Sequence, residues 1–349
     1  MLKKGLTQFR MGVKNRAQAR RVLLSEANVR LGRPTLRSLE FAVTWICNMH
    51  CEFCYAEDLM YSRKRPPNIS VDLFADVLRQ AHALGLIHVN ITGGEPMVRK
   101  DILEVVRAVP KDVVASMVVN STLLNKEKLE ALKAAGLSTV QMSYGQNYDK
   151  HFKIELARHA IRIGLGVTLS IVNIKAERKW VLEALEMAPR EGFSVLFNYP
   201  MRYKNEGLDS EVYWKYRYEP YVREDNLFWS GKDRCPAGTT KIYVTNDGDV
   251  MTCDRIHGSF GNITKEPLEP IWRRMYARFK DMKTFCLLET CPEQWKENNR
   301  RSRKRYSLAH IGTSEDPFNV FKGTPVENDL VPVSSFAQAL AKATTKAPS

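Results

Sequence analysis

Six short runs of apolar and β-branched residues alternate with helical patterns through the middle of the chain, and this alternation constrains the fold most strongly. Strands are expected at residues 39–45, 87–92, 113–119, 139–143, 167–172 and 195–199. Helices are expected between them at residues 71–84, 102–109, 126–135, 152–163 and 178–189, with Ser70 as the N-cap of the first. Six consecutive βα units predict an α/β fold with a parallel sheet and right-handed crossovers.

Three cysteines follow the first predicted strand with the spacing C-x3-C-x2-C: Cys47, Cys51 and Cys54. Three thiolates so close in sequence can converge on one soft metal centre. A [4Fe–4S] cluster is ordinarily held by four cysteines, so three would leave one iron free for a substrate or cofactor. A zinc site or a cluster of reactive thiols also fits this spacing when it is taken alone.

A second motif, Gly93-Gly94-Glu95-Pro96, follows the second predicted strand. Together with the cysteines it resembles the radical S-adenosylmethionine (SAM) superfamily. The resemblance implies that the free iron of a [4Fe–4S] cluster binds the amino and carboxylate groups of SAM. One electron, from a donor such as flavodoxin or ferredoxin, then yields a 5′-deoxyadenosyl radical that removes a substrate hydrogen atom. It also implies that Gly93, Gly94 and Glu95 hold the SAM amino group, and that Phe53 lies near the adenine.

The resemblance implies a partial (β/α)6 TIM-like barrel, in agreement with the six predicted units. Active sites of such barrels lie at the carboxyl ends of the strands, where both motifs fall. The same family pattern makes the strand-end residues Asn120, Ser121 and Ser143 candidate SAM contacts. Asn198 and Tyr199 are candidates to border adenine or substrate. Each of these could instead be an ordinary turn residue, because Ser and Asn are common in turns.

The other four cysteines all lie in the last third of the chain: Cys235, Cys253, Cys286 and Cys291. An odd total of seven and no recognisable secretory signal argue against a disulfide framework. Asn246-Asp247-Gly248-Asp249 predicts a hairpin turn between two strands. The region resembles the SPASM or twitch domain of many radical SAM enzymes, which implies that the four cysteines hold one auxiliary [4Fe–4S] cluster. A zinc site with the same four ligands stays open.

Positive charge is concentrated near the start of a chain whose net charge is +14. Leu2, Leu6, Phe9 and Val13 recur at helical spacing among basic residues. A basic amphipathic helix of this kind either lies on an anionic membrane or packs on the barrel, and we favour packing. The basic run 296–305 suits anionic partners, but no aromatic recognition motif accompanies either segment, so no nucleic acid is expected.

Four regions are predicted in total: a basic helical extension (1–36), the radical SAM core (37–230), a SPASM/twitch-like domain (231–310) and a disordered tail (311–349). No run approaches about 20 apolar residues, so a cytoplasmic protein is expected, at most peripheral to the membrane. The predicted activity is oxidation or rearrangement of a small polyol, sugar or nucleotide-linked substrate. Peptide modification, membrane-lipid modification and a metal-binding scaffold without catalysis are the alternatives.

Overall fold

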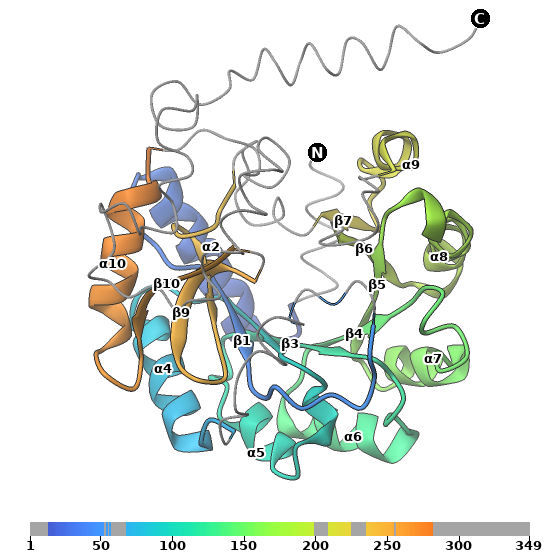
Figure 1. Ribbon diagram of the computed structural model, residues 1–349, viewed down its shortest axis with the longest axis horizontal. Coiled ribbons are helices and arrows are strands. Elements are labelled where there is room, and N and C mark those ends of the chain that lie inside the picture. The colour runs from blue at the N-terminus through green and yellow to red at the C-terminus, as the bar shows by residue number, and fades with distance from the viewer. Residues whose placement is uncertain are drawn as a thin grey trace, which may run out of the picture.

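The computed structural model describes residues 13–51, 54, 56, 68–198, 209–224, 235–254 and 256–281. Ten described strands form one continuous sheet in the order β10-β9-β8-β1-β2-β3-β4-β5-β6-β7. Figure 1 shows this sheet curving around the centre of the molecule, with helices on its outer side. The chain therefore folds as a mostly parallel α/β structure, as predicted.

The six predicted strands all form and pair in parallel, each with the next along the chain. Their bounds are β1 (Ser38–Ala42), β2 (His88–Thr92), β3 (Val114–Val119), β4 (Thr139–Ser143), β5 (Gly166–Val172) and β6 (Ser194–Asn198). A seventh parallel strand, β7 (Val222–Glu224), extends the sheet beyond β6. The prediction of a partial barrel is confirmed, with one more parallel strand at its far edge.

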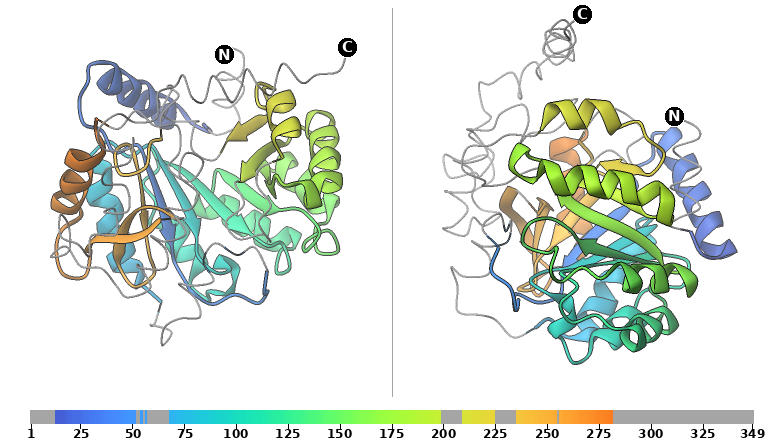
Figure 2. Two further views of the ribbon diagram at one scale, coloured as in Figure 1. Left: turned by 45° about the horizontal axis from the view of Figure 1, so that its top comes forward. Right: turned by 90° about the vertical axis from the view of Figure 1, so that its right-hand side faces the viewer.

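The helices that cross between these strands cover the outer face of the sheet, as the right-hand view of Figure 2 shows. Their bounds are α4 (Val71–Ala83), α5 (Ile102–Arg107), α6 (Lys126–Ala135), α7 (Ile154–Arg162) and α8 (Arg178–Glu191). Local sequence fixes several of their ends. The side chains of Ser70 and Asn125 accept hydrogen bonds from Leu73 N and Lys128 N, and Gly136 ends α6 with φ 114°.

The two faces of the barrel strands differ in polarity. Outward positions such as Phe41, Ile91 and Met117 are buried against the helices in one large apolar core. Inward positions alternate with them and are mostly polar. The inward residues of β1–β6 and β8 include Ser38, Glu40, His88, Asn90, Thr92, Ser116, Thr139, Gln141, Ser143, Thr168, Ser170, Asn198, Lys241 and Tyr243.

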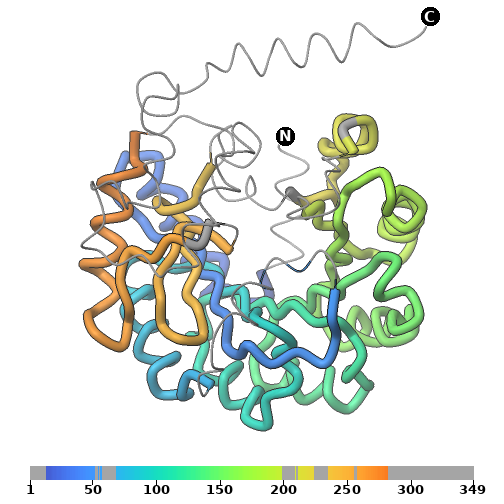
Figure 3. Tube along the Cα trace, in the orientation of Figure 1, coloured from blue at the N-terminus to red at the C-terminus, as the bar shows by residue number. Residues whose placement is uncertain are grey.

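The predicted C-terminal hairpin forms, and it joins the barrel sheet directly. Strand β8 (Lys241–Val244) pairs in parallel with β1, and β9 (Asp249–Cys253) and β10 (Ile256–Asn262) follow antiparallel. Figure 3 shows these late segments beside the early strand β1, with α10 (Leu268–Phe279) next to them. The boundary predicted between residues 230 and 231 lies outside the described residues.

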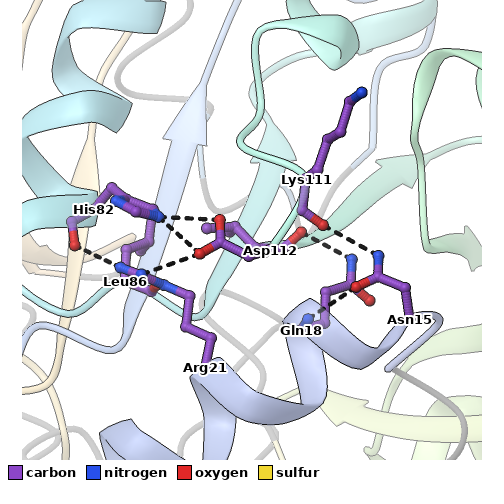
Figure 4. A network of polar contacts seen from close by, with 8 residues as sticks. Asn15, Gln18, Arg21, His82, Leu86, Lys111 and Asp112 are labelled. Atoms are coloured by element: carbon purple, nitrogen blue, oxygen red, sulfur yellow. Dashed lines mark hydrogen bonds and ion pairs between the residues drawn. The ribbon is translucent and has the colours of Figure 1, made fainter.

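Helix α2 (Arg16–Arg30) lies across the amino ends of the barrel strands. Gln18 Nε2 donates to Val113 O, just before β3, and Arg21 Nη1 forms an ion pair with Asp112 at 3.2 Å. Figure 4 shows Arg21 and Asp112 meeting beside His82 from α4. These contacts correspond to the favoured alternative, in which the N-terminal helix packs on the barrel.

Asn15 is the N-cap of α2, so Val13 precedes this helix, and the buried residues of α2 are Gln18 and Ser25. Most of the predicted apolar face lies outside the described residues, so that face stays a prediction. No helix among the described residues is long and apolar enough to span a membrane. Several predicted features lie outside the described residues: Leu2, Leu6, Phe9, Phe53, Tyr199, Cys286, Cys291, the run 296–305 and the tail 311–349.

Candidate active site at the carboxyl ends of the barrel strands

The three closely spaced cysteines lie on the loop that leaves the carboxyl end of β1, and all three are partly buried. Cys54 N donates to Cys51 O at 3.1 Å, which tightens the second half of the motif into a turn. Burial raises the pKa of the Cys47 and Cys51 thiols above the usual value. Such thiols ionise when a positive centre, such as iron, compensates the charge.

The Gly93-Gly94 segment runs directly against the cysteine loop. Gly94 N donates to Thr44 O at 2.7 Å, and Glu95 N donates to Ile46 O at 2.8 Å. A Cβ atom on Gly94 would lie 2.6 Å from the Ile46 carbonyl carbon, and one on Gly93 would overlap Thr44 O. The lack of a side chain at Gly93 and Gly94 therefore allows the cysteine loop to pack directly against their backbone.

Glu95 is 1% exposed, and its two carboxylate oxygens are both engaged. Oε1 accepts from Met97 N at 3.0 Å, and Oε2 accepts from Asn120 N at 2.7 Å, at the end of β3. Burial raises the pKa of Glu95 to about 7, against the opposing effect of these two hydrogen bonds. A buried carboxylate of this kind is stabilised by a cationic partner, such as an ammonium group.

A ring of hydrogen bonds ties the end of β3 to the cysteine loop. Asn120 Nδ2 donates to Asn48 Oδ1, and Asn48 Nδ2 donates to Thr122 Oγ1, both at 2.8 Å. Thr122 Oγ1 closes the ring by donating to Asn120 Oδ1 at 2.7 Å. Asn120 was a predicted site residue, whereas Asn48 and Thr122 were not.

Ser121, also a predicted site residue, has two unusual properties. Its φ angle of 66° is the only positive value of a non-glycine residue in the part of the chain that the structure describes. Its hydroxyl is buried and has no hydrogen-bond partner there. Strain and an unmet hydrogen bond at one residue are typical of a position that contacts a ligand.

The next two strands bring further polar side chains to the same rim. Ser143 ends β4 and is paired in register with Ser170 on β5. The Ser170 hydroxyl accepts a hydrogen bond from Asn198 Nδ2 at 2.7 Å. After β4, the Tyr148 hydroxyl lies 3.1 Å from Cys51 Sγ. Tyr148 was not predicted, because a tyrosine in a loop carries no sequence signal of what it faces.

Arg99 is a second residue that sequence analysis did not single out. It is 4% exposed, and its Nη1 donates to Val43 O at 2.7 Å and to Ile69 O at 3.0 Å. A bidentate ion pair with Asp101 holds the guanidinium in place. Arg99 therefore fixes the root of the cysteine loop from the segment that follows Gly-Gly-Glu-Pro.

The C-terminal hairpin packs against the cysteine loop from the other side. Tyr243 and Met251 form a small apolar cluster with Trp45, and Cys47 and Cys54 pack against it. Cys235 and Cys253 contact the main core. Cys286 and Cys291 lie outside the described residues, so the predicted four-cysteine arrangement stays a prediction.

Two groups beside the cysteine loop could contact a polar, cationic cofactor. They are the buried Glu95 carboxylate and the Ser121 hydroxyl, which has no hydrogen-bond partner in the described part of the chain. Among the described residues, no three His, Cys, Asp or Glu side chains are grouped as in a site for a single metal ion.

Comparison with protein families gives two matches. The radical SAM superfamily model matches residues 42–206, from the end of β1 past β6. The SPASM model, described as an iron-sulfur cluster-binding domain, matches residues 235–293 and so includes all four C-terminal cysteines. The two matches coincide with the two regions singled out from the cysteine spacings.

Individual relatives carry two kinds of name. A probable GTP 3′,8-cyclase of Pyrococcus abyssi is 35% identical over 128 residues, which cover 36% of this chain and 40% of the relative. A PqqA peptide cyclase of Gluconobacter oxydans is 34% identical over 108 residues, which cover 31% and 30%. The chain thus spans well under half the length of these curated relatives.

Among solved structures, Streptococcus suis SuiB bound to its precursor peptide SuiA has the same fold, with a TM-score of 0.57 at 17% identity. The match covers 74% of this chain and 70% of SuiB. The radical SAM domain implies a [4Fe–4S] cluster with SAM, and the SPASM domain implies auxiliary iron–sulfur clusters. Residues 42–206 therefore form a radical SAM domain, and residues 235–293 a SPASM domain.

Proposed function

We propose that Cys47, Cys51 and Cys54 hold the catalytic cluster, and that Cys235, Cys253, Cys286 and Cys291 hold an auxiliary cluster. The convergence of the cysteine loop with the loops after β2 and β3 supports the first assignment. The position of the four later cysteines within the SPASM match supports the second. We further propose that SAM is bound by Gly93, Gly94, Glu95, Asn120, Ser121 and Ser143, with Phe53 near its adenine.

The cluster with SAM supplies, after reduction by a donor such as flavodoxin or ferredoxin, a 5′-deoxyadenosyl radical that removes a substrate hydrogen atom. The chain positions the reactants. Glu95, held by Met97 N and Asn120 N, presents a fixed negative charge to the SAM ammonium. The Ser121 hydroxyl offers a hydrogen bond that nothing in the described chain takes up. Trp45 and the hairpin residue Tyr243 shield one side of the cysteine loop from water.

The polar interior of the barrel carries our proposal on the substrate. Closed barrels of this type are filled by bulky apolar side chains. Here Gln141 donates to Asn90 at 3.2 Å across two strands, and Lys241 forms an ion pair with Glu40 at 3.1 Å. A lipid tail would find little apolar surface among these inward positions, whereas a small molecule with several hydroxyl groups could exchange hydrogen bonds with them.

Two other buried hydroxyls strengthen the point. Thr168, within β5, is 1% exposed and Ser121, at the rim, is 6% exposed, and their hydroxyl oxygens have no hydrogen-bond partner in the described chain. An unmet buried hydroxyl costs about 1–3 kcal/mol, which a polar substrate would recover. We therefore propose oxidation or rearrangement of a small polyol, sugar or nucleotide-linked compound.

A peptide substrate is the second candidate, because two of the similar proteins are named for peptides. A peptide would insert one side chain into the same polar interior and leave its backbone outside. The two candidates differ in the size of the substrate molecule, which an experiment can separate.

The test uses hydrogen transfer to 5′-deoxyadenosine. Extracts of cells grown in deuterated medium are divided into small polar molecules, peptides and lipids, and each is added to the anaerobically reconstituted enzyme with SAM and reductant. We expect deuterium in 5′-deoxyadenosine, by mass spectrometry, with the small polar fraction. Transfer only from peptides would favour the second candidate. Cleavage of SAM by the variant with Cys47, Cys51 and Cys54 all replaced by Ala would overturn the cluster assignment.

A further inference from the structure

Tyr148 reaches the cysteine loop from a different part of the barrel. It lies on the loop after β4, 97 residues beyond Cys51, and its hydroxyl is 3.1 Å from Cys51 Sγ. The phenol therefore reaches the central cysteine of the motif.

The loop that carries Tyr148 is fixed by contacts that do not involve the cysteines. Gly145 has a φ of 144°, and a Cβ atom there would lie 2.6 Å from Glu177 Oε2. The same carboxylate oxygen, from a glutamate that is 3% exposed, accepts from Gln146 N at 2.9 Å. The Glu177 side chain thus occupies the space that only a glycine leaves.

Backbone hydrogen bonds then close the turn around the tyrosine. Tyr148 N donates to Gly145 O at 2.9 Å, and Phe152 N donates to Tyr148 O at 2.8 Å. The Phe152 ring packs edge-on against Tyr144, with centroids 5.0 Å apart. The backbone of Tyr148 is consequently held in place by contacts other than those of the cysteines, which favours a directed contact over an incidental one.

We propose that the Tyr148 hydroxyl donates a hydrogen bond to the Cys51 thiolate of the catalytic cluster and thereby raises the reduction potential of that cluster. A thiolate carries no proton, so the phenol must be the donor in this pair. The added electron makes the cysteine sulfurs more negative, and the hydrogen bond therefore stabilises the reduced cluster more than the oxidised one. The inference rests on the proposed assignment of Cys51 as a cluster ligand.

Tyr148 is in this sense a positioning residue, because it acts on the cluster and not on the substrate. Its contribution is to make one-electron reduction by an external donor easier. A phenol with no such role would leave the potential unchanged when its hydroxyl is removed.

Tyr148→Phe tests the proposal, with Tyr144→Phe as the matched control. Tyr144 begins the same loop, but its hydroxyl donates to Glu183 Oε2 at 2.9 Å and not to a cysteine. The measurement is a redox titration of the reconstituted full-length enzyme, followed by electron paramagnetic resonance. The catalytic cluster is identified as the one whose spectrum changes when SAM is added.

We expect a lower midpoint potential for this cluster in Tyr148→Phe and an unchanged one in Tyr144→Phe, with equal iron content. We also expect slower 5′-deoxyadenosine formation with a weak donor such as flavodoxin, and recovery with a stronger reductant. An unchanged potential in Tyr148→Phe at full iron content would overturn the inference.

A second measurement covers the case in which Tyr148→Phe does not assemble its cluster. Fluorinated tyrosine at position 148 keeps the ring and is a stronger hydrogen-bond donor, so the midpoint potential should rise above that of the unmodified enzyme. No rise would overturn the inference. Retention of the SAM-responsive signal by the triple Cys47, Cys51 and Cys54 to Ala variant would instead refute the cluster assignment, so the two failures are distinguishable.

Discussion

The two ends of the barrel use similar polar residues for different purposes. At the amino ends of the strands, Asp112 pairs with both Arg21 and His82, and the contact joins α2 to the sheet. At the carboxyl ends, the buried hydroxyl of Ser121 has no hydrogen-bond partner among the residues that the structure describes. Glu95, in the same region, has a carboxylate whose pKa is raised to about 7 by burial.

The difference separates stability from function. Polar side chains that pair with each other, as Arg21, Asp112 and His82 do, need no ligand, and replacing one of them lowers the free energy of unfolding. A group that is buried but not fully compensated is better explained by a missing partner. Parallel barrels in general keep catalysis at the carboxyl ends and stability at the amino ends, and this chain follows the same division.

The largest expected effect is at Gly94, on the carboxyl side. In Gly94→Ala the new Cβ would lie 2.6 Å from the Ile46 carbonyl carbon, which is backbone and cannot move aside. The cysteine loop and the Gly-Gly-Glu-Pro segment would separate, and we expect SAM cleavage to fall about 100-fold. The measurement is the rate of 5′-deoxyadenosine formation by cluster-loaded enzyme.

Gly136→Ala is the control for this substitution. Gly136 ends α6 with a φ of 114°, but nothing lies within 4 Å of a Cβ placed there. This variant should lose about 1 kcal/mol of unfolding free energy through backbone strain and keep its SAM cleavage. Equal loss of activity in both variants would contradict the division between the two ends.

Sequence predicted the parts of the molecule that are set locally. The bounds of the helix at residues 126–135 and the strand at 139–143 were both predicted as the structure has them. The helix has a side-chain cap at its start and a glycine after its end, and the strand is a short run with apolar and β-branched residues that follows this glycine. The hairpin after residue 241 was predicted from its Asn-Asp-Gly turn. The cysteines and the Gly-Gly-Glu-Pro motif were recognised by their spacing together with their resemblance to the radical SAM superfamily.

The rest depends on which loops meet in three dimensions. Helix α2 packs on the barrel through Gln18 and Arg21, and such polar contacts leave no apolar period in the sequence. The contacts of Asn48 with Asn120, and of Tyr148 with Cys51, join loops separated by 72 and 97 residues. No local pattern encodes such pairs, since they arise only when the barrel curves.

Glu95→Gln is expected to have the next largest effect, on SAM affinity, and it tests the role of one buried carboxylate at the carboxyl end. The amide keeps the shape, but its nitrogen would face either Met97 N or Asn120 N, which are both donors. We expect SAM to bind about 10–100-fold more weakly, since hydrogen bonds to a charged group contribute about 1.5–3 kcal/mol. Isothermal titration of cluster-loaded protein with SAM measures this, and unchanged affinity would exclude Glu95 from the SAM site.

At the amino end, Asp112→Ala removes the shared partner of Arg21 and His82. The Asp112 side chain is 30% exposed, so solvent screens part of the interaction. We expect a loss of about 1 kcal/mol in unfolding free energy, measured by urea denaturation, and an unchanged rate of SAM cleavage. A lower rate at full cluster content would show that the two ends are coupled.

The smallest expected effect is a pH dependence from His88, inside the amino half of the barrel. Its ring nitrogens contact the hydroxyls of Ser38 at 3.1 Å and Ser116 at 2.9 Å. Burial, followed by the charges of Arg223 and Lys241, lowers the pKa of His88 to about 3. In the unfolded chain, the His88 side chain therefore binds a proton near pH 6.5, whereas in the folded chain it stays neutral at that pH. Stability from this residue is complete above pH 6.5 and declines as the pH falls toward 3.

Between pH 7 and pH 6 this linkage amounts to about 0.7 kcal/mol of unfolding free energy. His88→Asn removes the titrating ring and keeps a polar side chain among the serines, so the difference between the two pH values should shrink by that amount. Urea denaturation of cluster-loaded wild-type and variant protein at both pH values measures it, and any acid sensitivity of the clusters is common to both proteins. An identical pH dependence would mean that His88 is protonated inside the fold. The amino half would then contain an uncompensated charge of the kind that we assign only to the carboxyl end.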